Sequence, residues 1–154
     1  MATLSNMQVS EIDLVYRNKV RARDRLTVSS SSLAYEALMA VWDLNKIDLV
    51  EQSKLMLLDA SLKCLGVVDL SAGGITAVHI DPRIVFAAAL KARATAIILA
   101  HNHPSQNTKP SESDIRMTKR FAEIGQLHDI TLEDHLIVTT DGYYSMRENG
   151  VIPT

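Results

Sequence analysis

The sequence predicts one α/β domain of the α+β kind, in which helices flank a single mixed or mainly antiparallel β-sheet. Short apolar runs typical of strands occur in both halves of the chain, and three stretches have the apolar spacing of helices. These elements follow no regular βαβ order, which favours a mixed sheet. Hydrophobic residues make up 47% and charged residues 22% of the 154 residues, which is enough apolar material for one core and unlike a disordered chain.

The first part of the chain is expected to contain a strand and a helix. Residues 11–25 have the pattern of extended chain, and five basic residues alternate there with other residues, so that a strand would place them on one face: Arg17, Lys19, Arg21, Arg23 and Arg25. Apolar residues recur at helical spacing over 33–44, after four serines that are good N-cap residues. We expect 1–48 to form an N-terminal extension packed on a core domain of residues 49–154.

The remaining elements alternate between strands and helices. Short apolar runs predict strands over 55–58, 64–70, 75–80 and 96–100, the last of which is apolar on both faces like an interior strand and ends at His101. Pro82 predicts the start of a helix through Arg93. A polar loop over 102–110 precedes a helix over 111–127, and the turn pair Asp141-Gly142 predicts a hairpin over 136–145.

Charge and composition exclude several classes of protein. The net charge of −2 argues against a protein that coats nucleic acid through its overall field. The first residues lack a signal-peptide pattern, and no apolar run approaches the roughly 18 residues of a membrane span. Cys64 is the single cysteine and cannot form a disulfide within the chain, so we expect a buried, inert thiol. These features predict a cytoplasmic protein without a membrane partner.

Two histidines at the end of the strand over 96–100 are candidate metal ligands. Because successive strand residues point to opposite faces, His101 and His103 present their imidazoles on the same side. Ser111 and Asp114 lie three residues apart in the first turn of the next helix and share one face of it. Two histidines and a carboxylate form a known ligand set of catalytic zinc, which leaves a fourth position for water. The sequence therefore predicts one zinc ion per chain, held by His101, His103 and Asp114.

Structural interpretations of the same residues stand beside this prediction. A histidine at a strand end is commonly a polar cap, although two at this spacing beside a loop are less easily explained so. Ser111 and Asp114 also match a capping pattern, in which the serine accepts a backbone N–H and the aspartate complements the helix dipole. On that segment alone, capping is the simpler interpretation.

The motif around these residues resembles the JAMM (MPN+) metalloprotease signature as it occurs in the RadC family. The segments His101-Asn-His103-Pro104-Ser105 and Pro110-Ser111-Glu-Ser-Asp114 carry two histidines one residue apart, ten intervening residues, and then the aspartate, with a serine three residues before it. Asp81-Pro82-Arg83, Asp134-His135-Leu136-Ile137 and Tyr144-Ser145 also resemble RadC-like chains, so the similarity covers about residues 51–150. The resemblance implies a JAMM or cytidine-deaminase-like architecture.

The resemblance also implies roles for further residues. The family pattern requires a glutamate on an early strand as general base, and Glu51 stands at the expected place; without the resemblance it would be an ordinary solvated glutamate. Ser111 would stabilise the oxyanion. Asp134 and His135 are a second candidate pair, able to orient a ligand or simply to begin a strand as polar residues. RadC-like chains usually carry glycine after His-Pro-Ser, where this chain has Gln106.

The function implied is a zinc-dependent metallohydrolase that cleaves a peptide, isopeptide or related amide bond, with a peptide or protein as substrate. Longer RadC-like proteins carry a helix-hairpin-helix segment and a DNA-repair label, whereas this chain resembles the short form without that segment. The alternative is a DNA-associated protein, nucleic-acid binding or nuclease, whose basic row contacts phosphates; that row is equally interpreted as a charged strand edge that prevents pairing. A scaffold that keeps the metal fold without turnover is a third interpretation. The sequence is compatible with a homodimer.

Overall fold

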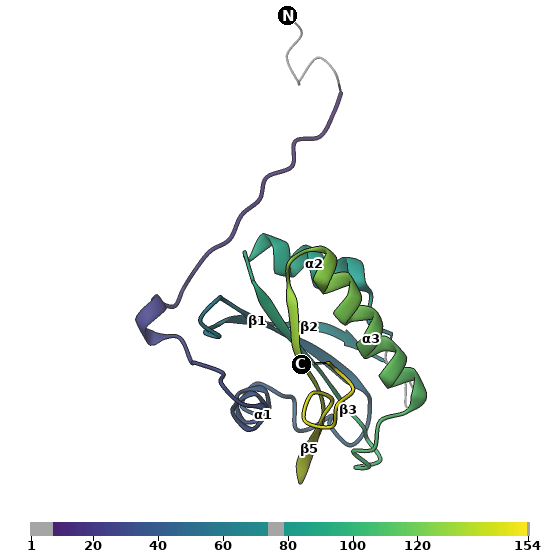
Figure 1. Ribbon diagram of the computed structural model, residues 1–154. Coiled ribbons are helices and arrows are strands. Elements are labelled where there is room, and N and C mark those ends of the chain that lie inside the picture. Colours follow the sequence, from purple (N-terminus) through teal and green to yellow (C-terminus); the bar gives the residue numbers. More distant parts are fainter. Residues whose placement is uncertain (1–7, 74–78, 154) are drawn as a thin grey trace, which may run out of the picture.

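A five-stranded mixed sheet forms the centre of the domain, in the order β2-β1-β3-β4-β5 (Figure 1). The computed structural model describes residues 8–73 and 79–153. The strands are β1 (Gln52–Leu58), β2 (Cys64–Ala72), β3 (Ala96–Asn102), β4 (Thr131–Thr139) and β5 (Gly142–Ser145). Neighbouring strands pair antiparallel except β3 and β4, which are parallel. The predicted class, one α+β domain with a mixed sheet flanked by helices, is confirmed.

Helices cover both faces of the sheet and separate the core into two layers. The helices are α1 (Ser31–Met39), α2 (Pro82–Lys91) and α3 (Glu112–Leu127), and Figure 1 shows α2 and α3 together on one side of the sheet, with α1 on the other. Side chains at alternate strand positions enter different layers: Leu99 packs with α2 and α3, whereas Ala100 packs with α1. By the same alternation, His101 faces the side of α2 and α3, and Asn102 faces the side of α1.

The helices α2 and α3 begin within one residue of their predicted starts, whereas α1 begins two residues before the predicted 33 and ends at Met39 instead of 44. The Ser30 hydroxyl accepts the backbone N–H of Leu33 at the start of α1, and Asp81 caps α2, whose first residue is proline. The Asp141-Gly142 turn joins β4 to β5, with Leu136 opposite Ser145, so the predicted hairpin is confirmed. Only residues 79–80 of the strand expected over 75–80 fall in the described part of the chain, and they have no strand structure; residues 75–78 lie outside it.

Two strands, β1 and β4, begin several residues before the apolar runs that predict them. β1 begins at Gln52 and β4 at Thr131, because polar residues inside both strands are buried with partners instead of ending the strand. The Lys54 ammonium, for example, forms an ion pair with Asp69 and lies over the ring of Trp42. Such paired polar residues interrupt the apolar pattern without interrupting the sheet.

The strand expected over residues 11–25 is wrong. Residues 9–20 have no regular structure and are exposed, and Figure 1 shows this purple segment extending away from the sheet. A short 3-10 helix, η2 (Ala22–Asp24), follows, and a single bridge joins Thr27 to Lys63. The basic residues therefore share no strand face. Three of them lie near carboxylates: Arg21 and Arg23 beside Asp24, and Arg25 beside Asp59.

The helix expected in the first 48 residues packs on the sheet. Ala34 and Leu38 of α1 are fully buried in the layer that also holds Trp42 and Ile47. Cys64 begins the edge strand β2 and is only half-buried, so the expected full burial is wrong; burial still raises the pKa of its thiol, against a backbone contact to Gly66. Among the described residues, no helix combines the length and apolar character needed to cross a bilayer.

Candidate metal centre

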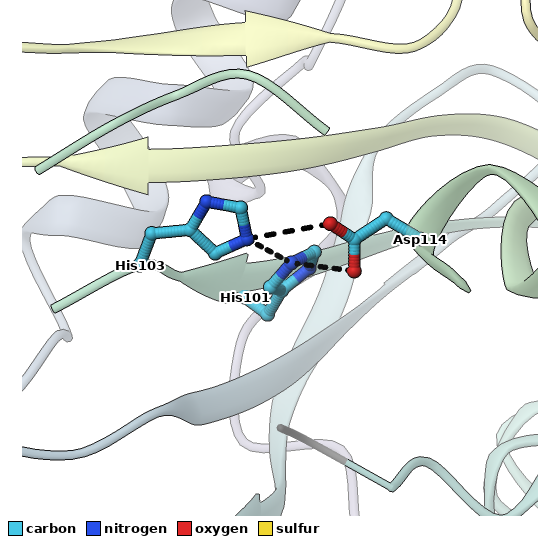
Figure 2. Close-up of side chains that lie close together, drawn as sticks. All are labelled: His101, His103 and Asp114. Carbon is cyan, nitrogen blue, oxygen red and sulfur yellow. Dashed lines mark hydrogen bonds and ion pairs between the residues drawn. The ribbon is translucent and has the colours of Figure 1, made fainter. Parts of the chain in front are cut away.

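His101, His103 and Asp114 come together where β3 ends and α3 begins. His101 follows Leu99 by two residues and therefore faces the α2 and α3 side of the sheet, and His103 directly follows the strand. The Nε2 atoms of the two histidines lie 3.1 Å apart. One Asp114 oxygen lies 3.3 Å from Nε2 of His101, and the other lies 3.4 Å from Nε2 of His103. Figure 2 shows the two rings and the carboxylate pointing toward one another.

The outer nitrogen of each imidazole is occupied by a hydrogen bond. Nδ1 of His103 lies 2.6 Å from the backbone carbonyl of Asn107, which can only accept, so this nitrogen carries the hydrogen. Nδ1 of His101 lies 2.8 Å from Nε2 of His135. A neutral His103 of this tautomer directs the lone pair of Nε2 at Asp114. Electron-rich atoms that converge in this way repel one another unless a cation lies between them.

The spacing of the three groups fits a zinc ion. Zinc–nitrogen bonds of about 2.0–2.1 Å at tetrahedral angles separate two ligand atoms by about 3.3 Å. The observed separations of 3.1, 3.3 and 3.4 Å lie close to this value. The three residues also form the one group of at least three histidine, cysteine or acidic residues in the described chain whose ligand atoms could share an ion. Two imidazoles and one carboxylate are ligands that zinc prefers.

The electrostatics of the cluster favour a positive charge at its centre. Burial acts to raise the pKa of the Asp114 carboxyl, but hydrogen bonds from His101 and His103 outweigh burial and hold that pKa far below its usual range. The hydrogen bond to Asp114 raises the pKa of His103, against desolvation and with help from the charge of Glu51. Without a metal, a proton on an imidazole therefore supplies the positive charge; with a metal, the ion takes that place.

The start of α3 is a complete capping box. The Ser111 hydroxyl accepts the backbone N–H of Asp114 at 3.0 Å, and the Asp114 carboxylate accepts the backbone N–H of Ser111 at 2.8 Å. The capping interpretation of these residues is thus confirmed. It is compatible with ligation, because the carboxylate still faces the histidines. The hydrogen of the Ser111 hydroxyl is not used by the cap, which leaves it able to donate.

Glu51 lies on the same face as the histidines. β1 pairs antiparallel with β3, with Ser53 opposite His101, and extending this register by two residues brings Glu51 opposite His103. Residues directly opposite each other project to the same face of a sheet. Glu51 is 8% exposed, and its charge raises the pKa of His103. An early strand thus brings a buried carboxylate to the edge of the cluster.

Asp134 and His135, predicted as a pair, point to opposite faces. His135 contacts His101 from the α3 side, and complete burial lowers its pKa well below the ordinary value. The Asp134 carboxylate instead accepts the Ser145 hydroxyl at 2.5 Å and the backbone N–H of Arg147 at 3.0 Å. The Asp134 carboxylate is therefore directed to the turn after β5, and His135 is the member of the pair that contacts a proposed ligand.

Sequence reasoning missed two participants. Thr118 donates to the backbone carbonyl of Asp114 at 2.7 Å and contacts Nδ1 of His135 at 2.6 Å. Its position four residues after Asp114 on the same helix face was a usable signal. The backbone carbonyl of Asn107, which accepts the hydrogen of His103 Nδ1, could not be predicted from the sequence, because every residue has a backbone carbonyl.

Gln106, at the position where the resemblance implies glycine, has a backbone conformation that glycine adopts readily. Its φ of 65° lies in the left-handed region that favours glycine. The Gln106 side chain reaches Asp48 and accepts the Thr140 hydroxyl at 3.3 Å. These contacts tie the loop to two other segments where glycine would offer none.

Comparison with known proteins agrees with the geometry. A sequence model of the family described as RadC-like JAB domain matches residues 28–151, a range that includes α1 and all five strands. A UPF0758 protein of Symbiobacterium thermophilum is 41% identical over 103 residues, which are 67% of this chain and 44% of that relative. A UPF0758 protein of Porphyromonas gingivalis is 36% identical over 130 residues, 83% of this chain and 56% of the relative. The chain spans about half the length of these curated relatives.

Proposed function

This chain belongs to the RadC-like JAB domain family, and on that premise we propose that it is a zinc-dependent hydrolase of the JAMM type that cleaves a peptide, isopeptide or related amide bond. The observation that carries the proposal is the convergence of His101, His103 and Asp114 at separations of 3.1–3.4 Å, with the outer nitrogen of His103 committed as a donor. Because Nε2 of His103 and both oxygens of Asp114 can act as acceptors there, a cation at the centre would satisfy all three groups.

Zinc supplies two kinds of chemistry in such a site, since it lowers the pKa of a coordinated water to about 7 and polarises a carbonyl oxygen. All further steps use side chains of this protein. Glu51 takes a proton from the attacking water as its oxygen bonds to the carbonyl carbon. Glu51 then delivers that proton to the leaving nitrogen as the carbon–nitrogen bond breaks. The Ser111 hydroxyl donates to the oxyanion that develops on the substrate.

The amide class of substrate is favoured by this set of groups. Amide hydrolysis needs a base for water, an acid for a poor leaving group and a donor for the oxyanion, and one carboxylate and one hydroxyl supply these three roles. Glu51 directly precedes β1 and Ser111 caps α3, so the proposed base and the proposed oxyanion donor come from different elements. A peptide or protein is therefore the substrate class that we propose.

The decisive experiment separates metal binding from turnover. Purified protein, loaded with one equivalent of zinc, is tested on fluorogenic peptides and on lysine-isopeptide-linked peptides, beside single-stranded and duplex DNA as tests of the nucleic-acid alternative. We expect cleavage of an amide substrate, and Glu51→Gln should retain zinc while losing at least about 100-fold in rate. Glu123→Gln, on the exposed face of α3, is the matched control and should behave as wild type.

Two results would overturn the proposal. One is a Glu51→Gln protein that retains both zinc and the wild-type rate, because the base would then lie elsewhere. The other is a wild-type protein that takes up no zinc at micromolar concentrations. Cleavage of DNA without cleavage of any amide would replace the proposed substrate class by the nucleic-acid alternative.

A further inference from the structure

Three buried side chains from three different elements form one continuous hydrogen-bond chain behind the metal cluster. It runs from Nδ1 of His101 on β3 to Nε2 of His135 on β4 at 2.8 Å, and from Nδ1 of His135 to the Thr118 hydroxyl on α3 at 2.6 Å. The Thr118 hydroxyl continues to the backbone carbonyl of Asp114 at 2.7 Å. His135 and Thr118 are 0% exposed and His101 is 1% exposed, so water does not compete for these bonds.

We infer that Thr118 and His135 are positioning residues, which fix the tautomer of His101 so that its Nε2 presents a lone pair to the ion. The inference deepens the proposed function and rests on it for the identity of the ion. It assigns to Thr118 a role at the site that the sequence motif does not contain.

The direction of the chain follows from counting hydrogens. The Asp114 carbonyl has no hydrogen, so the single hydrogen of the Thr118 hydroxyl must point to it. Thr118 therefore accepts from His135, whose Nδ1 carries the hydrogen. A neutral His135 then has a lone pair on Nε2, and Nδ1 of His101 must donate to it. Nε2 of a neutral His101 is left with its lone pair, directed at Asp114 and His103.

The same chain connects two of the three proposed ligand residues through the protein. His101 stands at the end of β3, and the Asp114 carbonyl belongs to the first turn of α3. A hydroxyl that bonds the carbonyl four residues earlier is common in helices and by itself has no functional meaning. Here the oxygen of that hydroxyl also accepts the hydrogen of His135 Nδ1. The hydroxyl on α3 therefore influences which ring nitrogen of His101, on β3, carries the hydrogen. Partners of this kind tune metal ligands in other proteins.

The test compares Thr118→Val, which removes the hydroxyl at nearly constant shape, with Thr118→Ser, which keeps it. The dissociation constant for zinc is measured by competition with a chromophoric chelator, and the imidazole tautomers are read from long-range proton–nitrogen NMR spectra with and without zinc. We expect Thr118→Val to weaken zinc binding by about 10–100-fold and Thr118→Ser to restore most of the loss. In the zinc-bound wild type, both His101 and His135 should carry their hydrogen on Nδ1.

Thr139→Val is the matched control for loss of a buried threonine hydroxyl. Thr139 is 1% exposed and bonds the Gly142 carbonyl at 3.0 Å within the β4–β5 turn. Its substitution should leave the zinc affinity unchanged. The wild-type spectra keep the inference testable even if Thr118→Val does not fold, because hydrogen on Nε2 of His135 in the wild type would overturn it directly.

The two proposals fail in different ways. A Thr118→Val protein that binds zinc as tightly as wild type, with His101 still carrying its hydrogen on Nδ1, would overturn the positioning role and leave the hydrolase proposal standing. A wild-type protein that binds zinc but cleaves no amide would overturn the hydrolase proposal, while tautomers and affinities would still report on Thr118 and His135.

Discussion

The side-chain amide of Asn102 holds the backbone on both sides of Glu51. Its Nδ2 donates to the Val50 carbonyl at 2.9 Å and to the Ile47 carbonyl at 2.7 Å, and its Oδ1 accepts the backbone N–H of Gln52 at 2.6 Å. Asn102 is 0% exposed and lies between the two histidines, with its side chain on the opposite face of β3. The strand that presents the histidines therefore also sets the position of the carboxylate.

We predict that Asn102→Ala is destabilising and slows turnover while zinc is retained. Removing the amide leaves buried backbone groups unpaired, at a cost of roughly 1–3 kcal/mol for each such group. Urea denaturation measures the loss of stability, and zinc stoichiometry shows that the ligands remain. Asn149→Ala removes an amide bond to the Ser145 carbonyl, on the exposed turn after β5, and serves as control. Equal urea midpoints for wild type and Asn102→Ala would contradict the assigned role.

Zinc should stabilise the folded protein through the three proposed ligands. An ion present at about 100 times its dissociation constant adds about 2.7 kcal/mol to the free energy of unfolding, because the unfolded chain lacks the assembled site. His103→Ala and Asp114→Ala should abolish the zinc-dependent rise in the unfolding temperature measured by scanning calorimetry. The exposed His79 lies outside the cluster, and His79→Ala should keep the full rise. A zinc-dependent rise that survives in His103→Ala would place the ion elsewhere.

Asp134 should make the free energy of unfolding larger in acid than at neutral pH, relative to a variant without this carboxyl. Burial raises the pKa of its carboxyl, against hydrogen bonds from Ser145 and the backbone of Arg147. Its contribution is therefore complete below the unfolded value of 3.8 and is lost as the pH rises through the higher folded value. The free energy of unfolding of wild type minus that of Asp134→Asn should increase as the pH falls from about 7 to about 4.

Chemical denaturation at several pH values measures this difference, in which titrations common to both proteins cancel. The exposed Asp13 provides the control Asp13→Asn, for which the difference should stay flat. A difference for Asp134→Asn that decreases toward acid would mean that the folded protein favours the charged carboxylate.

The left-handed backbone of Gln106 leads us to expect different stabilities for its alanine and glycine variants. Gln106→Ala removes the side-chain contacts to Asp48 and Thr140 but keeps a residue with a Cβ at a φ of 65°. Gln106→Gly removes the same contacts and also relieves the left-handed conformation, which costs an ordinary residue roughly 1–2 kcal/mol. We therefore expect the glycine variant to be the more stable of the two by about 1 kcal/mol in urea denaturation. Greater stability of the alanine variant would contradict this.

The sequence predicts the local parts of the site well, because each depends on the period of one element. His101 and His103 share a strand face, and the serine and aspartate at 111 and 114 share a helix turn, so spacing alone indicates which of these side chains lie on the same face. The partnership of His135 with Thr118 depends on β4 lying beside β3 in parallel, which no local pattern specifies. Asp134 and His135 are neighbours in β4, so their side chains point to opposite faces. The prediction of a joint role for the pair did not take this alternation into account.

Errors in the predicted elements have a common physical origin. The alternation over residues 11–25 is compatible with a strand, but a strand needs a hydrogen-bonding neighbour, and in the described chain the first bridge lies beyond this range, at Thr27. Conversely, Gln52-Ser53-Lys54 belongs to a strand although it is polar, because Ser71 and Asp69 on β2 pair with it. A hydropathy pattern indicates which residues are buried. The extent of a strand also depends on which residues of the neighbouring strand pair with it.

The three proposed ligands belong to one continuous stretch of 14 residues, from His101 to Asp114, whereas Glu51 directly precedes β1, 50 residues before His101. The residues proposed to bind the ion and the residue proposed to act as base are thus encoded in separate parts of the sequence. If the proposed function holds, a substitution of Glu51 alone would leave a protein that binds zinc but cleaves no substrate. One codon would then separate an enzyme from a protein that only binds the metal.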